Sequence, residues 1–141
     1  MRRAIELAAQ AEATGDVPIG AVLVSGDLVV EAKNEKEQRP DATAHAEMLA
    51  LQEASRRQGA WRLSDATLYV TKEPCVMCAG AMVAARIARL VYGCRDPKGG
   101  AAGSVVDVVA NPALNHCIEV TAGVLEAETA AQLQGFFRRR R

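Results

Sequence analysis

Two short segments of this sequence carry side chains that bind metals and transfer protons. The first is His45–Glu47 and the second is Pro74–Cys78. Cys75 and Cys78 are three residues apart, so both thiols point to the same side of a first helical turn. The amino terminus of a helix also stabilises the thiolate that a metal ion requires. The spacing therefore predicts that both thiols bind one ion.

His45 is the candidate third ligand of this ion. A zinc site of the Cys₂His type leaves one of four tetrahedral positions to water, which is typical of a catalytic site. Two thiolates cancel the charge of Zn²⁺, so the metal acidifies its water less than it would among neutral ligands. A base is then needed, and Glu47, two residues from His45, is expected to act as general acid and base without binding the metal.

Each segment alone is ambiguous. A lone His-x-Glu is usually a solvated pair, and a lone Cys-x-x-Cys can be a redox pair or half of a structural zinc site. In a structural site, Cys94, Cys117 or His116 would close the fourth position. The combination, in this order and with a helix start at each segment, is the known signature of zinc-dependent nucleobase deaminases.

The first part of the chain predicts a helix followed by a hairpin. Residues Met1–Ala13 have helical spacing, and Gly15 ends the pattern. Ile19–Val24 and Leu28–Ala32 are rich in β-branched residues and are separated by a turn composition. We therefore expect two antiparallel strands.

The middle of the chain predicts alternating helices and strands. Ala44–Arg57 is a helix with a buried start, followed by a strand at Thr67–Thr71, a helix at Val76–Arg86 and a strand at Leu90–Cys94. A strand, helix and strand in succession imply parallel pairing. The glycine-rich loop Arg95–Ser104 follows, and such loops often carry function.

A fifth strand is expected at Cys117–Thr121, before a last helix with an apolar stripe from Leu125 to Phe137 and four terminal arginines. These elements predict a three-layer α/β/α domain with a five-stranded mixed sheet. No repeat or linker divides it, so residues 1–141 are expected to be a single domain.

Composition excludes several classes of protein. The 141 residues have no net charge, so any contact with nucleic acid must come from a local patch. The longest apolar run, Val76–Ala85, falls short of the ~18 residues of a membrane span, so no membrane insertion is expected. No export signal is seen, and the four cysteines do not suggest disulfides, which favours a cytoplasmic protein. Cys94 and Cys117 are interpreted as packing residues.

The sequence resembles the bacterial tRNA-specific adenosine deaminases, of the cytidine/deoxycytidylate deaminase superfamily, along nearly its whole length. The matching segments are Val17–Val22, Thr43–Glu47, Glu73–Ala81, Arg95–Asp96 through Gly103–Ser104, Asn115–His116 and Phe136–Arg138. The resemblance implies a cytidine deaminase-like fold, one Zn²⁺ per subunit, and hydrolysis of adenosine to inosine at the wobble position of a tRNA anticodon. It also implies a homodimer whose two subunits together form the RNA surface.

The resemblance also implies roles for individual residues. Zinc hydroxide would attack C6 of adenine with Glu47 as proton shuttle, and His45, Cys75 and Cys78 would hold the metal. The implied substrate-binding residues are Asn34, Ala46, Asp96, Lys98, Asn115, Phe137 and Arg140.

Simpler interpretations exist for several of these residues. Asn34 can merely end a strand, and charged residues of a glycine-rich loop, such as Asp96 and Lys98, are often only solvated. Arginines at 138–141 are favoured at a helix carboxyl end without any ligand, although behind Phe136 and Phe137 they would also suit RNA phosphates.

One feature leaves the substrate open, and another leaves its preferred sequence context open. The zinc motif is shared with cytidine, deoxycytidylate and guanine deaminases, so a deaminase of a free base or nucleotide is the alternative function. The chain also departs from the family pattern at Lys72, where an apolar residue is frequent, and at Cys94, where a small residue is frequent.

Overall fold

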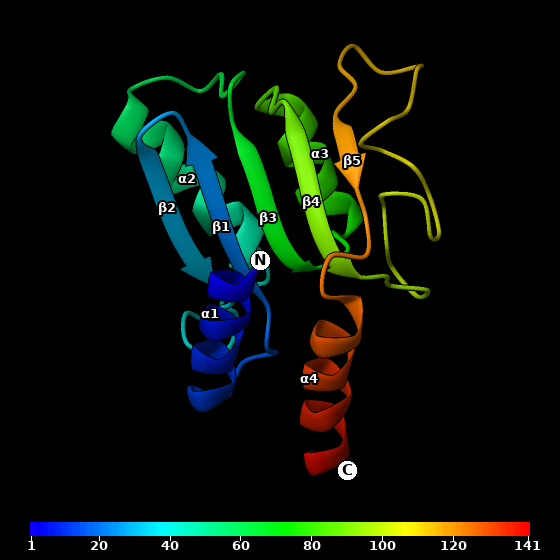
Figure 1. Ribbon diagram of the computed structural model, residues 1–141. Coiled ribbons are helices and arrows are strands. Elements are labelled where there is room, and N and C mark those ends of the chain that lie inside the picture. The colour runs from blue at the N-terminus through cyan, green and yellow to red at the C-terminus, as the bar shows by residue number, and fades with distance from the viewer.

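A mixed sheet of five strands organises the protein (Figure 1). The structure is a computed structural model that describes residues 1–141. In chain order the elements are α1 (Arg2–Ala13), β1 (Gly20–Ser25), β2 (Leu28–Lys33), α2 (Ala46–Gln58), β3 (Thr67–Lys72), α3 (Val76–Ala84), β4 (Arg89–Cys94), β5 (Glu119–Thr121) and α4 (Glu126–Arg139).

The strands lie in the order β2-β1-β3-β4-β5. β1 is antiparallel to both β2 and β3, whereas β3, β4 and β5 are parallel. The predicted hairpin and the predicted parallel pairing of β3 with β4 are both confirmed. Because β3 and β4 are parallel, their carboxyl ends lie at the same edge of the sheet, and α3 begins there directly after β3.

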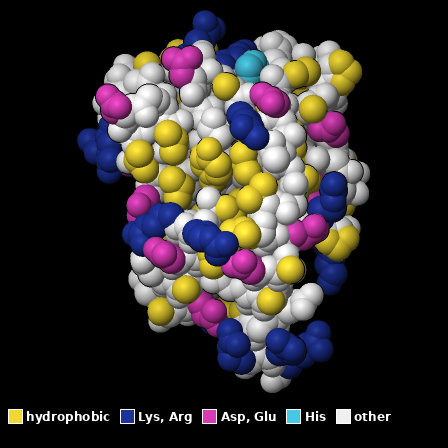
Figure 2. Space-filling view, viewed as in Figure 1, with side chains coloured by type: hydrophobic (Ala, Val, Ile, Leu, Met, Phe, Trp, Pro, Cys, Tyr) yellow, Lys and Arg dark blue, Asp and Glu magenta, His cyan; other side chains and the backbone are white.

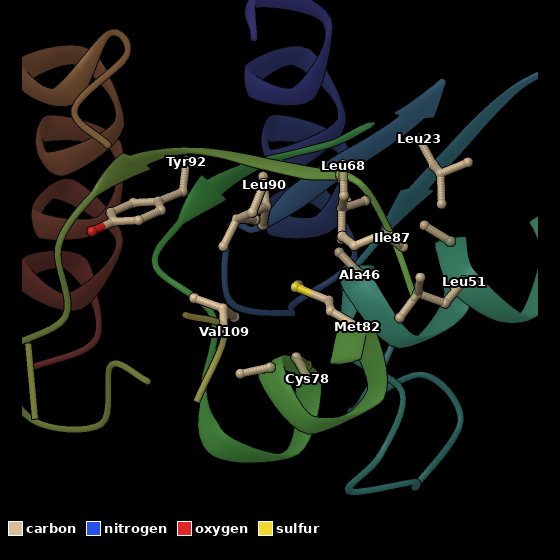
Figure 3. Packing of buried hydrophobic residues seen from close by; sticks show 14 of the residues in the cluster. Leu23, Ala46, Leu51, Leu68, Cys78, Met82, Ile87, Leu90, Tyr92 and Val109 are labelled. Atoms are coloured by element: carbon tan, nitrogen blue, oxygen red, sulfur yellow. The ribbon is translucent and has the colours of Figure 1, made fainter. Parts of the chain in front are cut away.

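The alternation of side chains along β1 explains the three layers. Ala21 and Leu23 belong to the main core, which also contains buried side chains of α2 and α3 (Figure 3). Val22 points to the other face, where it packs with Ala4 and Leu7 of α1. A β-carbon at Gly20 would lie 2.0 Å from the carbonyl oxygen of Ala4, so only glycine allows α1 to pack this closely. The predicted three-layer α/β/α arrangement is confirmed.

The remaining helix, α4, lies on the same face of the sheet as α1. The hydroxyl of its Thr129 packs against Gly93 of β4, where a β-carbon would come within 2.6 Å of it. The side-chain Nε2 atom of Gln132 donates a hydrogen bond of 3.1 Å to the backbone carbonyl oxygen of Ile5, which ties α4 to α1. None of the four helices is long and apolar enough to cross a membrane.

Several predicted boundaries differ from the structure by one residue, and three differ by two. α2 begins at Ala46 and not at Ala44, because His45 has extended backbone angles and forms the N-cap. α3 ends at Ala84 and not at Arg86, because Arg86 adopts a left-handed conformation (φ 62°) that turns the chain towards β4. β5 starts at Glu119 and not at Cys117, since the preceding residues form no strand.

The two remaining cysteines have different environments. Cys94 is buried in the main core, as its interpretation as a packing residue requires. Cys117 is exposed, so the same interpretation was wrong for this residue. It lies in the irregular segment before β5.

Candidate active site

The amino termini of α2 and α3 bring the three candidate ligands together. His45 is the N-cap of α2, Cys75 is the N-cap of α3, and Cys78 lies in the first turn of α3. The His45 Nδ1 atom is 3.6 Å from the Cys75 sulfur and 3.5 Å from the Cys78 sulfur. All three donor atoms lie within 4.8 Å of one another.

This geometry fits a tetrahedral zinc ion. Usual Zn–S and Zn–N bond lengths at a tetrahedral angle place sulfur and nitrogen about 3.6 Å apart. No further histidine, cysteine or carboxylate belongs to the group. The donor set is therefore that of an open site with three protein ligands.

The residues considered as a fourth ligand are engaged elsewhere. The Cys94 thiol donates to the carbonyl oxygen of Thr71, and a ring nitrogen of His116 lies 2.7 Å from the carbonyl oxygen of Ile87. Cys117 is exposed and contacts the carbonyl oxygen of Asn111. The structure thus gives no support to a closed structural zinc site.

The two thiols differ in how readily they ionise. A hydrogen bond from Cys78, helped by one from His45 and opposed by burial, lowers the pKa of Cys75 to about 3. The same contact with Cys75, together with burial, raises the pKa of Cys78. One sulfur therefore ionises readily, while the other requires a cation to displace its proton. The hydrogen bond with Cys75 also raises the pKa of His45.

Glu47 is a buried carboxylate that lies outside the group of three donor atoms. Its side chain is only 3% exposed, and its Oε2 atom has no hydrogen-bond partner. Burial raises the pKa of this carboxyl above its ordinary value. A buried oxygen without a partner costs free energy, so this carboxyl is a candidate functional group.

Asn34 connects the end of β2 to this site. The residue directly follows β2 and is 4% exposed. Its Oδ1 atom accepts a 2.8 Å hydrogen bond from the backbone nitrogen of Ala46. Ala46 as a whole is completely buried, so no atom of this residue is exposed to solvent. Asn34 therefore ends the strand and also fixes the residue between His45 and Glu47.

Comparison with known proteins identifies the family. The model of the MafB19-like deaminase family matches residues 1–141. The chain belongs to this family. The deaminase is 49% identical to a tRNA-specific adenosine deaminase of Bacillus subtilis, over 98% of this chain and 86% of that protein. It is 47% identical to a tRNA-specific adenosine deaminase of Haemophilus influenzae, over 100% of this chain and 83% of that protein.

Solved structures show the same fold for this deaminase. One comes from a study of A-to-I editing by deaminases at the wobble position of transfer RNA. It matches with a TM-score of 0.90 and 44% identity, over 94% of this chain and 97% of that chain. A guanine deaminase from Bacillus subtilis matches with a TM-score of 0.65 and 31% identity, over 99% and 90% of the two chains. The expected cytidine deaminase-like fold is confirmed.

Four of the remaining predicted residues line one groove of the deaminase. Asp96, Lys98, Phe137 and Arg140 border a volume of about 900 Å³ between the glycine-rich loop and α4. Phe137 is 51% exposed, so its ring is available to a ligand. The guanidinium of Arg140 is partly engaged, since it donates a hydrogen bond of 2.8 Å to the carbonyl oxygen of Gly15.

Asp96 is not merely solvated in the deaminase. Its carboxylate accepts a hydrogen bond of 3.0 Å from the backbone nitrogen of Lys98 and forms a 2.7 Å ion pair with Lys72. Burial alone would raise the pKa of Asp96, but these contacts lower it. Lys72 thus neutralises the one carboxylate that lines the groove.

Asn115 lies in a different place. It is exposed and borders a separate depression beside α3, together with Val76, Arg86 and Leu114. The structure therefore does not bring Asn115 into the groove that holds Asp96, Lys98, Phe137 and Arg140.

Glu73 was missed as a functional candidate. It is 2% exposed and its carboxylate faces the glycine-rich loop. Burial alone would raise the pKa of Glu73, but hydrogen bonds from Ser104 and from loop amides lower it. The sequence carries one sign of this role: Glu73 is a charged residue directly before Pro74 and Cys75, in a segment that must be buried to hold a metal site.

Replacing Asn34 by alanine is expected to destabilise the deaminase by about 1–3 kcal/mol, the usual cost of a buried donor without a partner. The donor left unpaired is the backbone nitrogen of Ala46. Urea unfolding measures the change. Asn34→Asp keeps an acceptor for this donor and should recover most of the loss, whereas equal losses in both variants would contradict the role of the Oδ1 atom.

Proposed function

We propose that this deaminase hydrolyses adenosine to inosine at the wobble position of a tRNA anticodon. The observation that carries the proposal is the 49% identity to a tRNA-specific adenosine deaminase over 98% of the chain, with an open Cys₂His donor set beside a buried carboxylate. The direct test is inosine formation on synthetic anticodon stem-loops. Stem-loops that remain adenosine at the wobble position would contradict the proposal.

The residues of the site have distinct tasks in this reaction. His45, Cys75 and Cys78 would hold zinc, which when bound activates water as a nucleophile for C6 of adenine. Glu47 accepts the proton of that water at its unpaired oxygen and delivers it to the ring nitrogen of the base. The same carboxylate then transfers the second proton to the amino group that leaves as ammonia. Burial raises the pKa of Glu47, which favours the first transfer because it makes the carboxylate a better proton acceptor.

The groove beside the glycine-rich loop is the proposed contact with the RNA backbone. The protein has no net charge, but this groove is lined by six cationic side chains: Lys72, Arg95, Lys98, Arg138, Arg140 and Arg141. Figure 2 shows Lys and Arg side chains gathered around the carboxyl-terminal end of α4. RNA loops are recognised by stacking of splayed bases and by phosphate contacts, and the exposed Phe137 ring and these cations supply both.

The double variant Arg138→Ala/Arg141→Ala is expected to bind an anticodon stem-loop more weakly and with a lower salt dependence. Each lost phosphate contact reduces the slope of log K against log salt by about 0.7 for a single strand. Fluorescence anisotropy at several salt concentrations measures both quantities. Arg139→Ala is the matched control, because Arg139 pairs with Glu12 and does not line the groove. An unchanged slope in the double variant would exclude these two residues from the interface.

A homodimer through the outer face of α3 is also part of the proposal. Trp61 and Val76 are 62% and 63% exposed, and apolar depressions lie on both sides of the helix. Exposed apolar side chains gathered in this way are typical of an interface. We expect Val76→Glu to shift the protein from dimer to monomer in light scattering, whereas Val29→Glu, an exposed valine of β2, should not. A monomeric wild-type protein would contradict this assembly.

The alternative function is deamination of a free base, and the similarity to a guanine deaminase supports it at 31% identity. Release of ammonia from free guanine or a cytosine nucleotide, without inosine in stem-loops, would favour it. As an enzyme that acts on tRNA, the protein is proposed to work in the cytoplasm.

A further inference from the structure

A buried carboxylate ties the end of β3 to the glycine-rich loop. Oε2 of Glu73 accepts a 2.9 Å hydrogen bond from the backbone nitrogen of Asp96. Oε1 accepts bonds of 3.0 Å from the backbone nitrogens of both Ala102 and Ser104. The Ser104 hydroxyl donates a further hydrogen bond to Oε2. Both ends of the loop thus converge on one side chain.

The loop is shaped around this carboxylate. A β-carbon on Gly100 would lie 2.4 Å from the carboxyl carbon of Glu73, so the loop backbone lies directly against the side chain. Glu73 forms no ion pair, and its charge is balanced by the loop's own donors. An amide would present an N–H group to these donors, which removes acceptors and adds repulsion.

The same short segment of chain carries a metal ligand. Glu73 lies two residues before Cys75. The backbone oxygen of Pro74 accepts a 2.8 Å hydrogen bond from Ala101, and Cys75 pairs with Gly100 in an isolated β-bridge. The loop is therefore attached to three successive residues, the last of which is the first thiol of the site.

We propose that Glu73 is a positioning residue that holds Asp96 and Lys98 of the glycine-rich loop in a fixed place relative to the metal ligand Cys75. Glu73 itself does not touch the substrate. It acts through the loop, whose polar side chains line the groove assigned to the RNA backbone. This inference rests on the proposed function, because the loop positions a nucleotide only if RNA is the substrate.

The first experiment measures the loop directly and requires no substrate. In Glu73→Gln, the backbone amides of Ala102 and Ser104 are expected to exchange their hydrogens faster than in the wild type, while the amides of β1 are unchanged. Ser104→Ala loses one of the four bonds and should show a smaller effect, and Ser104→Thr, which keeps the hydroxyl, should resemble the wild type. Loop exchange at the wild-type rate in Glu73→Gln would overturn the proposal.

The second experiment links the loop to the reaction. Glu73→Gln is expected to lower kcat/KM for an anticodon stem-loop by about ten- to a hundredfold through KM, since small displacements of positioning groups have effects of this size. Zinc content should stay at the wild-type level. In a double-mutant cycle with Lys98→Ala the two losses should not multiply, because both act through one loop. Multiplying losses, or a lower zinc content, would overturn the positioning role. A wild-type protein inactive on stem-loops would refute the proposed function, and hydrogen exchange would still decide on the contact itself.

Discussion

Replacing Glu47 by alanine is expected to lower turnover by orders of magnitude and to leave zinc bound. The carboxylate lies outside the group of three donor atoms, so its loss removes no ligand. Its role in proton transfer predicts a decrease in kcat of about 10²–10⁴-fold. The rate of inosine formation at a saturating concentration of stem-loop measures kcat. Elemental analysis of the purified variant measures the zinc content per chain.

The variant Glu47→Gln separates charge from shape. Glutamine fills nearly the same buried volume as glutamate but cannot accept and release a proton at neutral pH. It should therefore be as inactive as the alanine variant, with stability closer to the wild type, because alanine leaves a cavity. Normal rates in either variant would refute the mechanism, and loss of zinc from both would show that Glu47 helps to hold the metal.

Replacing Cys78 by serine is expected to remove both zinc binding and activity, since a hydroxyl does not ionise at neutral pH and binds zinc poorly. The variant should also lose the stability that the metal supplies. Zinc at 1,000 times its dissociation constant stabilises a folded protein by about 4.1 kcal/mol. Thermal unfolding with and without a chelator measures this contribution: chelation should lower the Tm of the wild type and leave that of Cys78→Ser unchanged.

Cys117→Ser is the matched control for this experiment. Cys117 is exposed and lies outside the donor group, so its replacement should change neither zinc content nor the response to chelator. A Cys78→Ser protein that retains one zinc and its activity would show that the pair at 75 and 78 has another task, such as redox chemistry.

The local features of the site were predictable from the sequence. His45 and Glu47 are two residues apart, and Cys75 and Cys78 are three apart at a helix start, so the backbone alone constrains each pair. The strand–helix–strand order also brings α3 to the carboxyl edge of the sheet. The spacing within each pair did not determine that the starts of α2 and α3, which are 30 residues apart in the sequence, meet in space. That expectation came from the order of the two motifs along the chain.

Contacts between distant segments were not predictable in the same way. The interaction of Glu73 with Ser104 spans 31 residues and depends on a loop whose shape follows no periodic pattern. The end of α3 at Ala84 was not predicted, because the left-handed residue that follows, Arg86, is not a glycine and so carries no sequence mark. Resemblance placed Asp96, Lys98, Phe137 and Arg140 among the substrate contacts, and the structure gathers these residues in one groove but leaves Asn115 apart.

The two chain ends call for different treatment when the protein is fused or immobilised. Arg141 lines the groove between the glycine-rich loop and α4, so any peptide joined after it would start where an RNA strand is expected to approach. The amino-terminal end lies at the start of α1, away from the carboxyl-terminal end of α4 (Figure 1). Affinity tags and surface attachment are therefore better placed before Met1, since a carboxyl-terminal tag would compete with nucleic acid and weaken its apparent affinity.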